Sequence, residues 1–206
     1  PAIYRLSWES GDGYRRHDFP GTLKPGEACF AQSRYYCLLS NWDAVEKLTQ
    51  LAEASGVVAK RDLRCDDWDL RDAVDYLLER LEELREESPG EPVALVSGGE
   101  LRCPVIGDGV GGRNQEFVLD CVYKIAGRRV VALSGGTDGV DGNSPACGAI
   151  ADGESLTRAR ALGLEPEDYR LRSDSYHFFE KLGDALLTGP TGTNVRDLRI
   201  LLAYPE

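Results

Sequence analysis

The sequence predicts an α/β fold, a layered domain with a mostly parallel or mixed sheet flanked by helices. Short apolar runs, typical of buried strands, alternate along the chain with longer amphipathic segments, typical of helices. Glycine-rich turns follow several of these runs, as they do at the strand ends of such sheets. The chain has 206 residues, 42% of them hydrophobic, which can fill the core of one large domain or two small ones.

The first part of the chain is expected to lead irregularly into the domain. Residues 1–33 are rich in glycine, proline and charge and lack sustained periodicity, so we interpret them as an irregular lead-in from a domain junction. The α/β domain is expected over residues 34–206. It opens with a short buried strand predicted over residues 35–39. Ser40 then caps a helix whose apolar residues recur at helical spacing, and Gly56 ends it.

The middle of the chain carries the clearest helix and two predicted strands. Over residues 69–87 the apolar residues form one stripe, and glutamate and arginine cover the other side, which predicts an amphipathic helix. The apolar run at 93–96 predicts a buried strand that ends in a tight turn at 97–100. A further strand is predicted over residues 101–106.

The remaining residues continue the alternation of helices and strands. The glycine-rich stretch at 135–142 is expected to be a loop, because glycine weakens both helices and strands. Helices are predicted over residues 114–126, 154–162 and 174–182, and strands over 130–133, 185–188 and 198–203.

Four glycine-rich segments begin directly after predicted strands, and together they indicate a binding surface. They follow Val96, Ile106, Leu133 and Leu187. In an α/β sheet such loops gather at the carboxyl edge, where ligands bind. One such loop by itself would be interpreted as a tight turn. Four of them at one edge, with Ser, Thr, Asn, Asp and Arg interleaved, favour a binding surface instead.

Four polar residues in these loops could carry chemistry. Arg113 and Asn114 lie where a helix is expected to begin, so its free N–H groups and the guanidinium could hold an anion; the alternative is an arginine that ties down a neighbouring loop. Asp138 and Asp141 could coordinate Mg²⁺ or accept a proton from a hydroxyl. Aspartate is also the ordinary residue of turns, and spacing alone favours that role.

Residues 107–112 formally match the dinucleotide-binding pattern G-x-G-x-x-G. The pattern lies deep in the chain, and the acidic residue expected about 20 positions later would fall at 127–130, which contains none. An NAD(P)-linked enzyme is therefore kept only as an alternative. The sequence has no Walker-type phosphate loop, EF-hand loop, G-x-S-x-G elbow or H-E-x-x-H motif.

Composition argues against several other classes of function. The formal net charge is -11 and the basic residues are scattered, so nucleic acid is not an expected partner. No apolar run approaches the roughly 18 residues that cross a bilayer, and the start lacks the order of a signal peptide, so we expect a cytoplasmic protein without a membrane partner. The six cysteines form no C-x-x-C pair and are expected to be mostly buried, reduced hydrophobes rather than zinc ligands. Because the chain has no methionine, we expect a fragment or a processed chain.

Four motifs, in order, resemble the MOFRL region of class II glycerate kinases. Residues 24–26, 40–41 and 97–100 resemble the preceding part of the same enzymes, so the likeness covers nearly everything after about residue 20. The four motifs are Gly-Gly-Arg-Asn-Gln-Glu at 111–116, Ser-Gly-Gly-Thr-Asp-Gly-Val-Asp-Gly at 134–142, Ser-Asp-Ser-Tyr at 173–176 and Thr-Gly-Pro-Thr-Gly-Thr-Asn-Val-Arg-Asp-Leu at 188–198.

The resemblance implies two α/β domains with an active site between them, where the γ-phosphoryl group of ATP passes to a hydroxyl of D-glycerate, usually the 2-hydroxyl. By resemblance, Arg113 matches an active-site arginine and Asp138 an active-site aspartate. These types of residue suit stabilisation of the moving group and the holding of Mg²⁺ or orientation of the nucleophile. Further contacts to substrate or phosphate are expected from Ser97, Gly98, Gly99, Glu100, Gly111, Gly112, Asn114, Thr137, Asp141, Thr191, Gly192, Thr193 and Asn194.

The resemblance also implies the partners of the chain: glycerate, ATP with Mg²⁺, and the amino-terminal domain of the same parent protein. In the family that domain carries an active-site lysine and further acidic residues. No segment here corresponds to it, so the chain alone is expected to be inactive. Whether the chain forms a homo-oligomer stays open.

One departure from the family pattern keeps other functions open. Where the family commonly has Pro-Thr-Asp-Ala-Ala-Gly, residues 143–148 place Pro145 in the acidic position. A ligand-binding or assembly domain without catalysis is therefore one alternative. Some members of the family are labelled hydroxypyruvate reductases, an NAD(P)-linked activity that the pattern at 107–112 supports only weakly.

Overall fold

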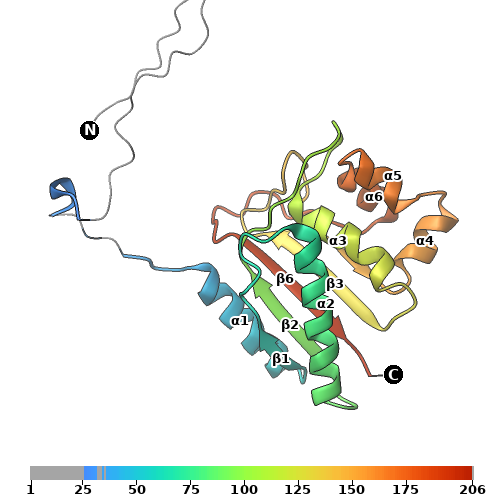
Figure 1. The fold of residues 1–206 in the computed structure, drawn as a ribbon, viewed down its shortest axis with the longest axis horizontal. Coiled ribbons are helices and arrows are strands. Elements are labelled where there is room, and N and C mark those ends of the chain that lie inside the picture. The colour runs from blue at the N-terminus through green and yellow to red at the C-terminus, as the bar shows by residue number, and fades with distance from the viewer. Residues whose placement is uncertain (1–25, 32–33, 35, 206) are drawn as a thin grey trace, which may run out of the picture. The chain divides into compact units, whose positions relative to one another are not determined.

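The computed structural model describes residues 26–31, 34 and 36–205 (Figure 1). It divides the chain into two units, Pro1–Cys37 and Leu38–Glu206. In the first unit the described residues contain one short 3-10 helix, Ala28–Phe30. Most of the irregular lead-in predicted over residues 1–33 lies outside the described residues.

The short strand predicted over residues 35–39 is wrong. Residue 35 lies outside the described residues, and Tyr36, Leu38 and Leu39 have no regular structure and are largely exposed. No strand of the sheet pairs with the described part of this run. A buried strand needs partners for its backbone N–H and C=O groups, which an apolar run does not supply by itself.

The second unit is built on a single mixed sheet, which confirms the predicted α/β fold. Its six strands lie in the order β1-β2-β6-β3-β4-β5. Within this sheet β1 and β2 pair in parallel, and the other neighbouring pairs are antiparallel. The strands are β1 (Val58–Arg61), β2 (Val93–Gly98), β3 (Val130–Gly136), β4 (Gly148–Asp152), β5 (Ala185–Leu186) and β6 (Asp197–Ala203).

The strand predicted over residues 101–106 does not form. Apart from an isolated bridge between Asp69 and Arg102, this segment has no β structure. Pro104 stands in its middle, and proline has no N–H to donate to a strand ladder. The segment is instead part of the loop that leads from β2 to the next helix.

The pairing pattern brings six strand ends to one edge of the sheet. Strands β1, β2, β3 and β5 run in one direction, and β4 and β6 run in the other. The carboxyl ends of the first four therefore lie beside the amino ends of β4 and β6. Loops 99–112, 137–147 and 187–196 all meet this edge. The glycine-rich loops thus gather together, as the sequence predicted.

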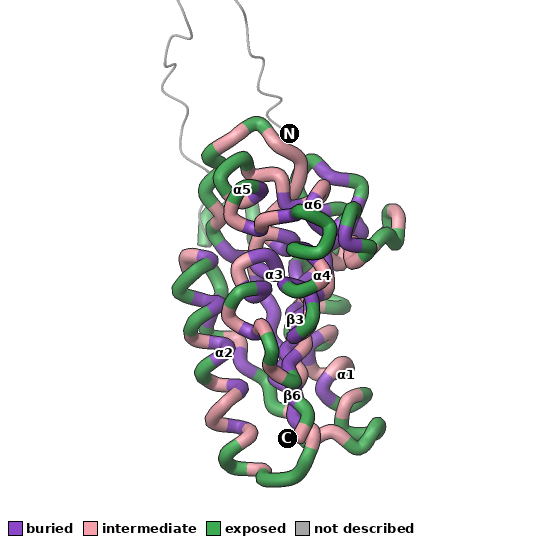
Figure 2. Tube along the Cα trace, turned by 90° about the vertical axis from the view of Figure 1, so that its right-hand side faces the viewer, coloured by how far each residue is buried: buried purple, intermediate pink, exposed green. Residues whose placement is uncertain are grey.

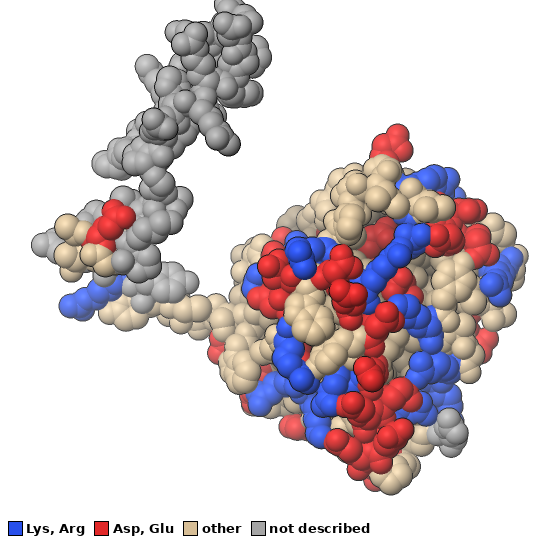
Figure 3. All heavy atoms as spheres, in the orientation of Figure 1, with Lys and Arg blue, Asp and Glu red and all other residues tan. Residues whose placement is uncertain are grey.

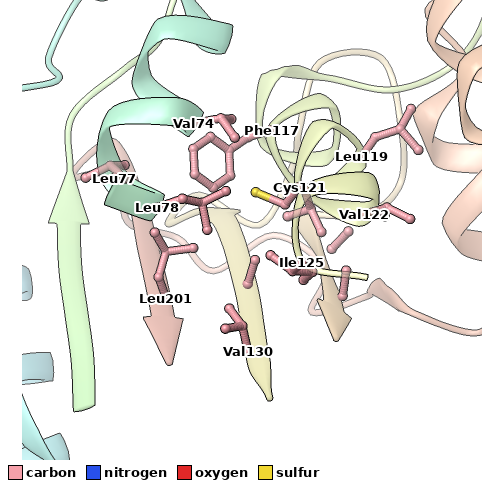
Figure 4. Packing of buried hydrophobic residues seen from close by; sticks show 14 of the residues in the cluster. Val74, Leu77, Leu78, Phe117, Leu119, Cys121, Val122, Ile125, Val130 and Leu201 are labelled. Carbon is pink, nitrogen blue, oxygen red and sulfur yellow. The ribbon is translucent and has the colours of Figure 1, made fainter. Parts of the chain in front are cut away.

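Two long helices, α2 (Leu70–Glu87) and α3 (Arg113–Lys124), cover one face of the sheet and match predicted helices. They contact each other and strands β2, β6, β3 and β4 between them. Leu77, Phe117 and Leu201 are among the residues buried between these helices and the sheet (Figure 4). This core holds the start of α3 in a fixed position at the loop-bearing edge.

The first helix, α1 (Asn41–Ala54), packs against β1 and β2. Ser40 caps it as predicted: its N–H donates to Asp43 Oδ2 at 2.7 Å as part of a capping box. A Cβ at Gly98 would meet Asn41 and Val45. Because side chains alternate along β2, α1 lies on the face opposite α2.

Three short helices complete the unit around α3 and β5. The buried residues lie along the strands and on the inner sides of the helices (Figure 2). α4 and α6 correspond to predicted helices, whereas α5 was not predicted. The bounds are α4 (Ser155–Ala161), α5 (Pro166–Leu171) and α6 (Ser175–Leu182).

The surface over α2 and α3 has no dominant sign of charge. Acidic and basic side chains are interspersed on the face that Figure 3 shows. Such a surface lacks the basic stripe that tracks a nucleic-acid backbone. Among the described residues, no helix combines the length and the apolar character needed to cross a bilayer.

Candidate functional site

A cavity of about 600 Å³ lies at the edge of the sheet where the loops meet. Its wall is formed by the loop after β2, the start of α3 and the loop after β3. Arg113 and Asp138, which the resemblance matches to active-site residues, both line this cavity. Three of the predicted binding residues line it as well, namely Gly111, Gly112 and Asp141.

Arg113 is held in place by two carboxylates. Its Nε and Nη2 donate to Asp197 Oδ2 and Oδ1 at 2.6 and 3.1 Å, a bidentate pair. Glu100 Oε1 lies 3.1 Å from Nη2 as well. Hydrogen bonding to Asp197 raises the pKa of Arg113, so the guanidinium stays charged. Its side chain remains 35% exposed and can contact a ligand.

A second arginine, Arg199, supports Asp197 from inside the sheet. Arg199 is 0% exposed, and its Nη2 lies 3.3 Å from Asp197 Oδ2. Its Nη1 donates to the carbonyl of Gly99 at 3.1 Å, and its guanidinium lies 5.5 Å from the centre of the Phe117 ring. Asp197 therefore sits between two cations, which compensates the burial of its charge. Neither Asp197 nor Arg199 was assigned a role from the sequence.

The start of α3 differs from the prediction that its N–H groups hold a ligand anion. Asp141, which is 2% exposed, occupies that place. Its Oδ1 accepts from the N–H and side-chain amide of Asn114, both at 3.1 Å, and its Oδ2 accepts from Gln115 N and Nε2 at 2.9 and 3.0 Å. Burial raises the pKa of Asp141, and these four hydrogen bonds oppose that change. Asp141 and Asn114 thus satisfy each other and stabilise the helix end.

Asp138 is fixed at the cavity by the two glycine-rich loops after β3 and β5. Its Oδ1 accepts from the N–H of Val140 at 3.2 Å, and its Oδ2 from Asn194 Nδ2 at 3.3 Å. Its carbonyl accepts from Thr191 N at 3.0 Å. Thr191 Oγ1 also donates to the carbonyl of Thr137 at 2.5 Å. Thr137, Thr191 and Asn194 therefore position the loop that carries Asp138.

The remaining predicted binding residues do not line the cavity. Ser97 and Gly98 are buried within β2, and α1 covers Gly98 so closely that a Cβ would lie 1.9 Å from Asn41 Oδ1. The fold leaves neither of them a free surface for a ligand, which corrects their predicted role. Gly99 is also buried, and its carbonyl is taken by Arg199. Glu100 and the stretch 191–194 keep exposed surface at the same edge.

The glycines of the segment 107–112 are explained by close packing rather than by a dinucleotide. A Cβ at Gly107 or Gly109 would come within 2.4 or 2.6 Å of the carbonyl oxygen of Arg172. A Cβ at Gly112 would come within 2.4 Å of the Asp141 carboxylate. The segment is therefore pressed against the loop before α6 and the cap of α3.

Glu116 has no role predicted from the sequence, yet it lines this cavity and a neighbouring smaller one. It lies one turn after Arg113, and this spacing places the two on the same side of α3. Its Oε1 is buried and has no hydrogen-bond partner among the described residues. Burial raises the pKa of Glu116 from 4.5 to about 7, against the opposing effects of the nearby Ser175 hydroxyl and of Arg170. The carboxyl group can therefore change its charge near neutral pH.

The carboxylates near the cavity offer limited metal binding. Within the described part of the chain, no three His, Cys, Asp or Glu side chains are grouped so as to hold a metal ion. Asp138 contributes one carboxylate to the cavity wall, which Asp141 and Glu116 also line. Mg²⁺ is often bound by one or two carboxylates together with substrate phosphates. Asp138 thus fits Mg²⁺ only where a nucleotide supplies the other ligands.

Comparison with known protein families and sequences finds one family model and relatives that carry two kinds of name. The model described as the MOFRL family matches residues 93–197. A protein named D-glycerate 2-kinase from Thermotoga maritima is 38% identical over 158 residues, covering 75% of this chain and 38% of that protein. A glycerate kinase from Danio rerio is 34% identical over 198 residues, covering 91% and 38%. A putative hydroxypyruvate reductase from Agrobacterium vitis is 44% identical over 114 residues, covering 54% and 30%.

Two solved structures share the fold. The crystal structure of a glycerate kinase from Thermotoga maritima matches with a TM-score of 0.74 and 36% identity, over 80% of this chain and 40% of that chain. A protein from Pyrococcus horikoshii matches with a TM-score of 0.76 and 32% identity, over 84% and 40%. The chain thus spans about two fifths of the length of these two relatives.

Proposed function

Because the chain belongs to the MOFRL family, we propose that it forms one side of the active site of a glycerate kinase. In the proposed reaction the γ-phosphoryl group of ATP passes to the 2-hydroxyl of D-glycerate and gives 2-phosphoglycerate. The observation that carries the proposal is the placement of Arg113 and Asp138 on the wall of one cavity. Relatives named glycerate kinase or glycerate 2-kinase support the same activity.

Arg113 is the proposed contact to the phosphoryl group. Catalysis of phosphoryl transfer depends chiefly on positioning and on stabilising charge on the moving group. The bidentate pair with Asp197 fixes the plane of the guanidinium before any ligand arrives. Because Asp197 is itself buried and held by Arg199, the direction of Arg113 is set by the sheet rather than by a surface loop.

Asp138 is the proposed contact to Mg²⁺ or to the substrate hydroxyl. When bound, Mg²⁺ would neutralise negative charge on the phosphates of ATP. Hydrogen bonds from Val140 and Asn194 fix the carboxylate at the cavity wall. Asp138 would therefore meet a ligand in a defined orientation.

A second domain of the same parent protein is proposed to complete the site. The chain matches 40% of the length of the Thermotoga maritima glycerate kinase structure. Most of that enzyme therefore lies outside the region of similarity. We propose that residues 34–206 are the MOFRL-containing domain, that residues 1–33 belong to the junction between domains, and that this chain alone transfers no phosphoryl group.

Two alternatives make different predictions. One alternative is an NAD(P)-linked hydroxypyruvate reductase, and two Agrobacterium vitis relatives are named putative hydroxypyruvate reductase. The glycines at 107–112 give that activity little support, because neighbouring chain segments fill the space beside them. A binding domain without catalysis is the other alternative, suggested by exposed Pro145 in the loop that contributes Asn143 to the cavity.

The test uses the full parent protein with Mg-ATP and D-glycerate, followed by ³¹P NMR. The proposal expects a phosphate ester on the 2-hydroxyl, and no ester from the present chain alone. Oxidation of a reduced nicotinamide cofactor by hydroxypyruvate, without ester formation, would establish the reductase instead. Binding of glycerate without either reaction would support a domain that lacks catalysis.

A further inference from the structure

Arg196 has a backbone conformation that is unusual for a residue with a side chain. Its φ is 71°, in the left-handed region that glycine favours. Three hydrogen bonds hold it there. Its carbonyl accepts from Thr137 N and Oγ1 at 3.1 and 2.7 Å, and its N–H donates to Asn194 Oδ1 at 2.9 Å. Strained residues fixed in this way tend to occur at functional sites.

The side chain of Arg196 reaches the same carboxylate that contacts Arg113. Glu100 Oε1 lies 3.1 Å from Arg113 Nη2 and 3.9 Å from Arg196 Nε. Arg196 Nη1 also donates to Asp66 Oδ2 at 2.7 Å, and Asp66 Oδ1 accepts from the N–H of Glu100 at 3.0 Å. Two guanidinium groups on different segments therefore converge on one carboxylate oxygen.

Arg113, Arg196, Arg199 and the carboxylates Glu100 and Asp197 form a charged cluster. Its buried ion pairs belong to the fold, whereas an exposed carboxylate can be replaced by a ligand. Asp197 is buried between Arg113 and Arg199, so its pairing belongs to the fold. The side chains of Glu100 and Arg196 are 40% and 46% exposed. Exposed ion pairs contribute little to stability, because water screens them. The Glu100 carboxylate can therefore be exchanged for another anion at small cost.

We propose that Arg196 is a second anion-binding residue beside Arg113, and that Glu100 occupies the place where both guanidinium groups bind a phosphoryl group. Arginine suits this role because its planar fork matches the oxygens of phosphate. Phosphate carries more charge than one carboxylate and displaces Glu100. The proposal deepens the proposed kinase function and rests on it for the identity of the phosphorylated ligand. The anion site itself does not depend on catalysis.

The alternative is that Arg196 only ties together the loops that contain Asp66 and Glu100. Both roles predict that loss of the side chain matters, but they differ for Glu100. If Glu100 competes with a ligand, its neutralisation strengthens anion binding. If the cluster only joins loops, neutralisation of Glu100 leaves anion binding unchanged or weakens it.

The test measures the affinity for inorganic phosphate by isothermal titration calorimetry at low ionic strength, with the full parent protein and with the present chain. Arg196→Gly removes the side chain and keeps the left-handed backbone that glycine accepts. It should weaken phosphate binding on the order of tenfold, the effect of losing a charged hydrogen bond. Glu100→Gln should strengthen it on the order of fivefold, because a competing charge is lost.

Arg102→Gln is the matched control. Arg102 is 68% exposed, lies two residues from Glu100 and pairs with Asp67, so its loss removes one positive charge nearby without touching the cluster. It should change phosphate affinity less than about twofold. Equal effects of the Arg196 and Arg102 variants, or no gain from Glu100→Gln, would overturn the proposal. Thermal unfolding of each variant shows whether it remains folded. If the Arg196 variant does not fold, Glu100→Gln still tests the proposal.

Two further measurements distinguish a phosphate site from a carboxylate site, and the anion site from the kinase activity. Titration with acetate tests a carboxylate, and Arg196-dependent binding of acetate but not of phosphate would overturn the phosphoryl assignment. Phosphate binding with the expected variant pattern, in a parent protein that forms no ester from Mg-ATP and glycerate, would keep the anion site and refute the kinase.

Discussion

Asp197 holds Arg113 and Arg199 through the same oxygen atom. Its Oδ2 lies 2.6 Å from Arg113 Nε and 3.3 Å from Arg199 Nη2, and the residue is 1% exposed. A residue at the start of β6 thus orients a residue 84 positions earlier at the start of α3. The cavity receives a guanidinium whose direction is fixed by the centre of the sheet.

Replacing Asp197 by Asn should lower both catalysis and stability. The variant loses a bidentate contact that orients Arg113, so kcat of the full parent protein should fall on the order of tenfold to a hundredfold. Arg199 would be left buried beside a neutral group, which should cost about 3 kcal/mol of unfolding free energy. Steady-state kinetics and urea unfolding measure the two effects. Asp75→Asn, which removes the exposed partner of Lys124, is the control, and an unchanged kcat in the Asp197 variant contradicts the orienting role.

Replacing Asp141 by Asn should loosen the start of α3. Asparagine keeps one acceptor oxygen where the carboxylate accepts four hydrogen bonds from Asn114 and Gln115. The loss should cost about 2 kcal/mol. Hydrogen exchange should speed up at the amides of these two residues and not at the Arg71 amide, which Asp69 caps in α2. Equal exchange rates of the Asn114 and Gln115 amides in the variant and the wild type would show that the cap is not needed.

The length and pattern of a segment determined how much of the fold could be predicted. The helix at Leu70–Glu87 was predicted because its apolar stripe is long. The strand Val58–Arg61 was missed, since it is short and mostly exposed. The strand Gly148–Asp152 was missed because it follows a glycine-rich stretch and consists largely of small residues. Short elements that depend on pairing leave a weak local signal.

The sequence indicated the cavity residues that stand in glycine-rich loops. It gave no sign of the contacts between residues that are far apart in the chain. Arg113 and Asp138 stand in glycine-rich turns, so their exposure at the loop-bearing edge could be inferred. Asp141 caps a helix that begins 28 positions earlier in the chain. Arg199 is a buried charge on β6, and the fold shows that Asp197 and the Gly99 carbonyl compensate it.

Glu116→Gln should change the dependence of stability on pH. The folded protein keeps the Glu116 carboxyl protonated up to about pH 7, whereas the unfolded chain ionises it near pH 4.5. The unfolding free energy of the wild type should therefore fall as pH rises between these values, and glutamine escapes this loss. From pH 5 to pH 8 the variant should gain about 2 kcal/mol relative to the wild type. Urea unfolding at both pH values measures it, and an equal difference at both would refute the raised pKa.

Gly139→Ala should separate the two loops that fix Asp138. Gly139 has φ +89, and a Cβ there would lie 2.0 Å from the carbonyl oxygen of Gly189. Gly163 also has a positive φ, +71, but a Cβ there meets nothing within 4 Å. Gly163→Ala should therefore cost about 1 kcal/mol for backbone strain alone, and Gly139→Ala at least about 2 kcal/mol more, as overpacking does. Equal destabilisation of the two variants in thermal unfolding would mean that the loops are not tightly packed.

The most direct measurement is a crystal structure of the full parent protein with bound 2-phosphoglycerate and Mg²⁺-nucleotide. The account predicts phosphoryl oxygens about 3 Å from the Arg113 guanidinium, the distance of a charged hydrogen bond. It also predicts that the Asp138 carboxylate contacts the same ligand or its Mg²⁺. Phosphoryl groups bound away from this cavity, with Arg113 still paired only to its carboxylates, would contradict it.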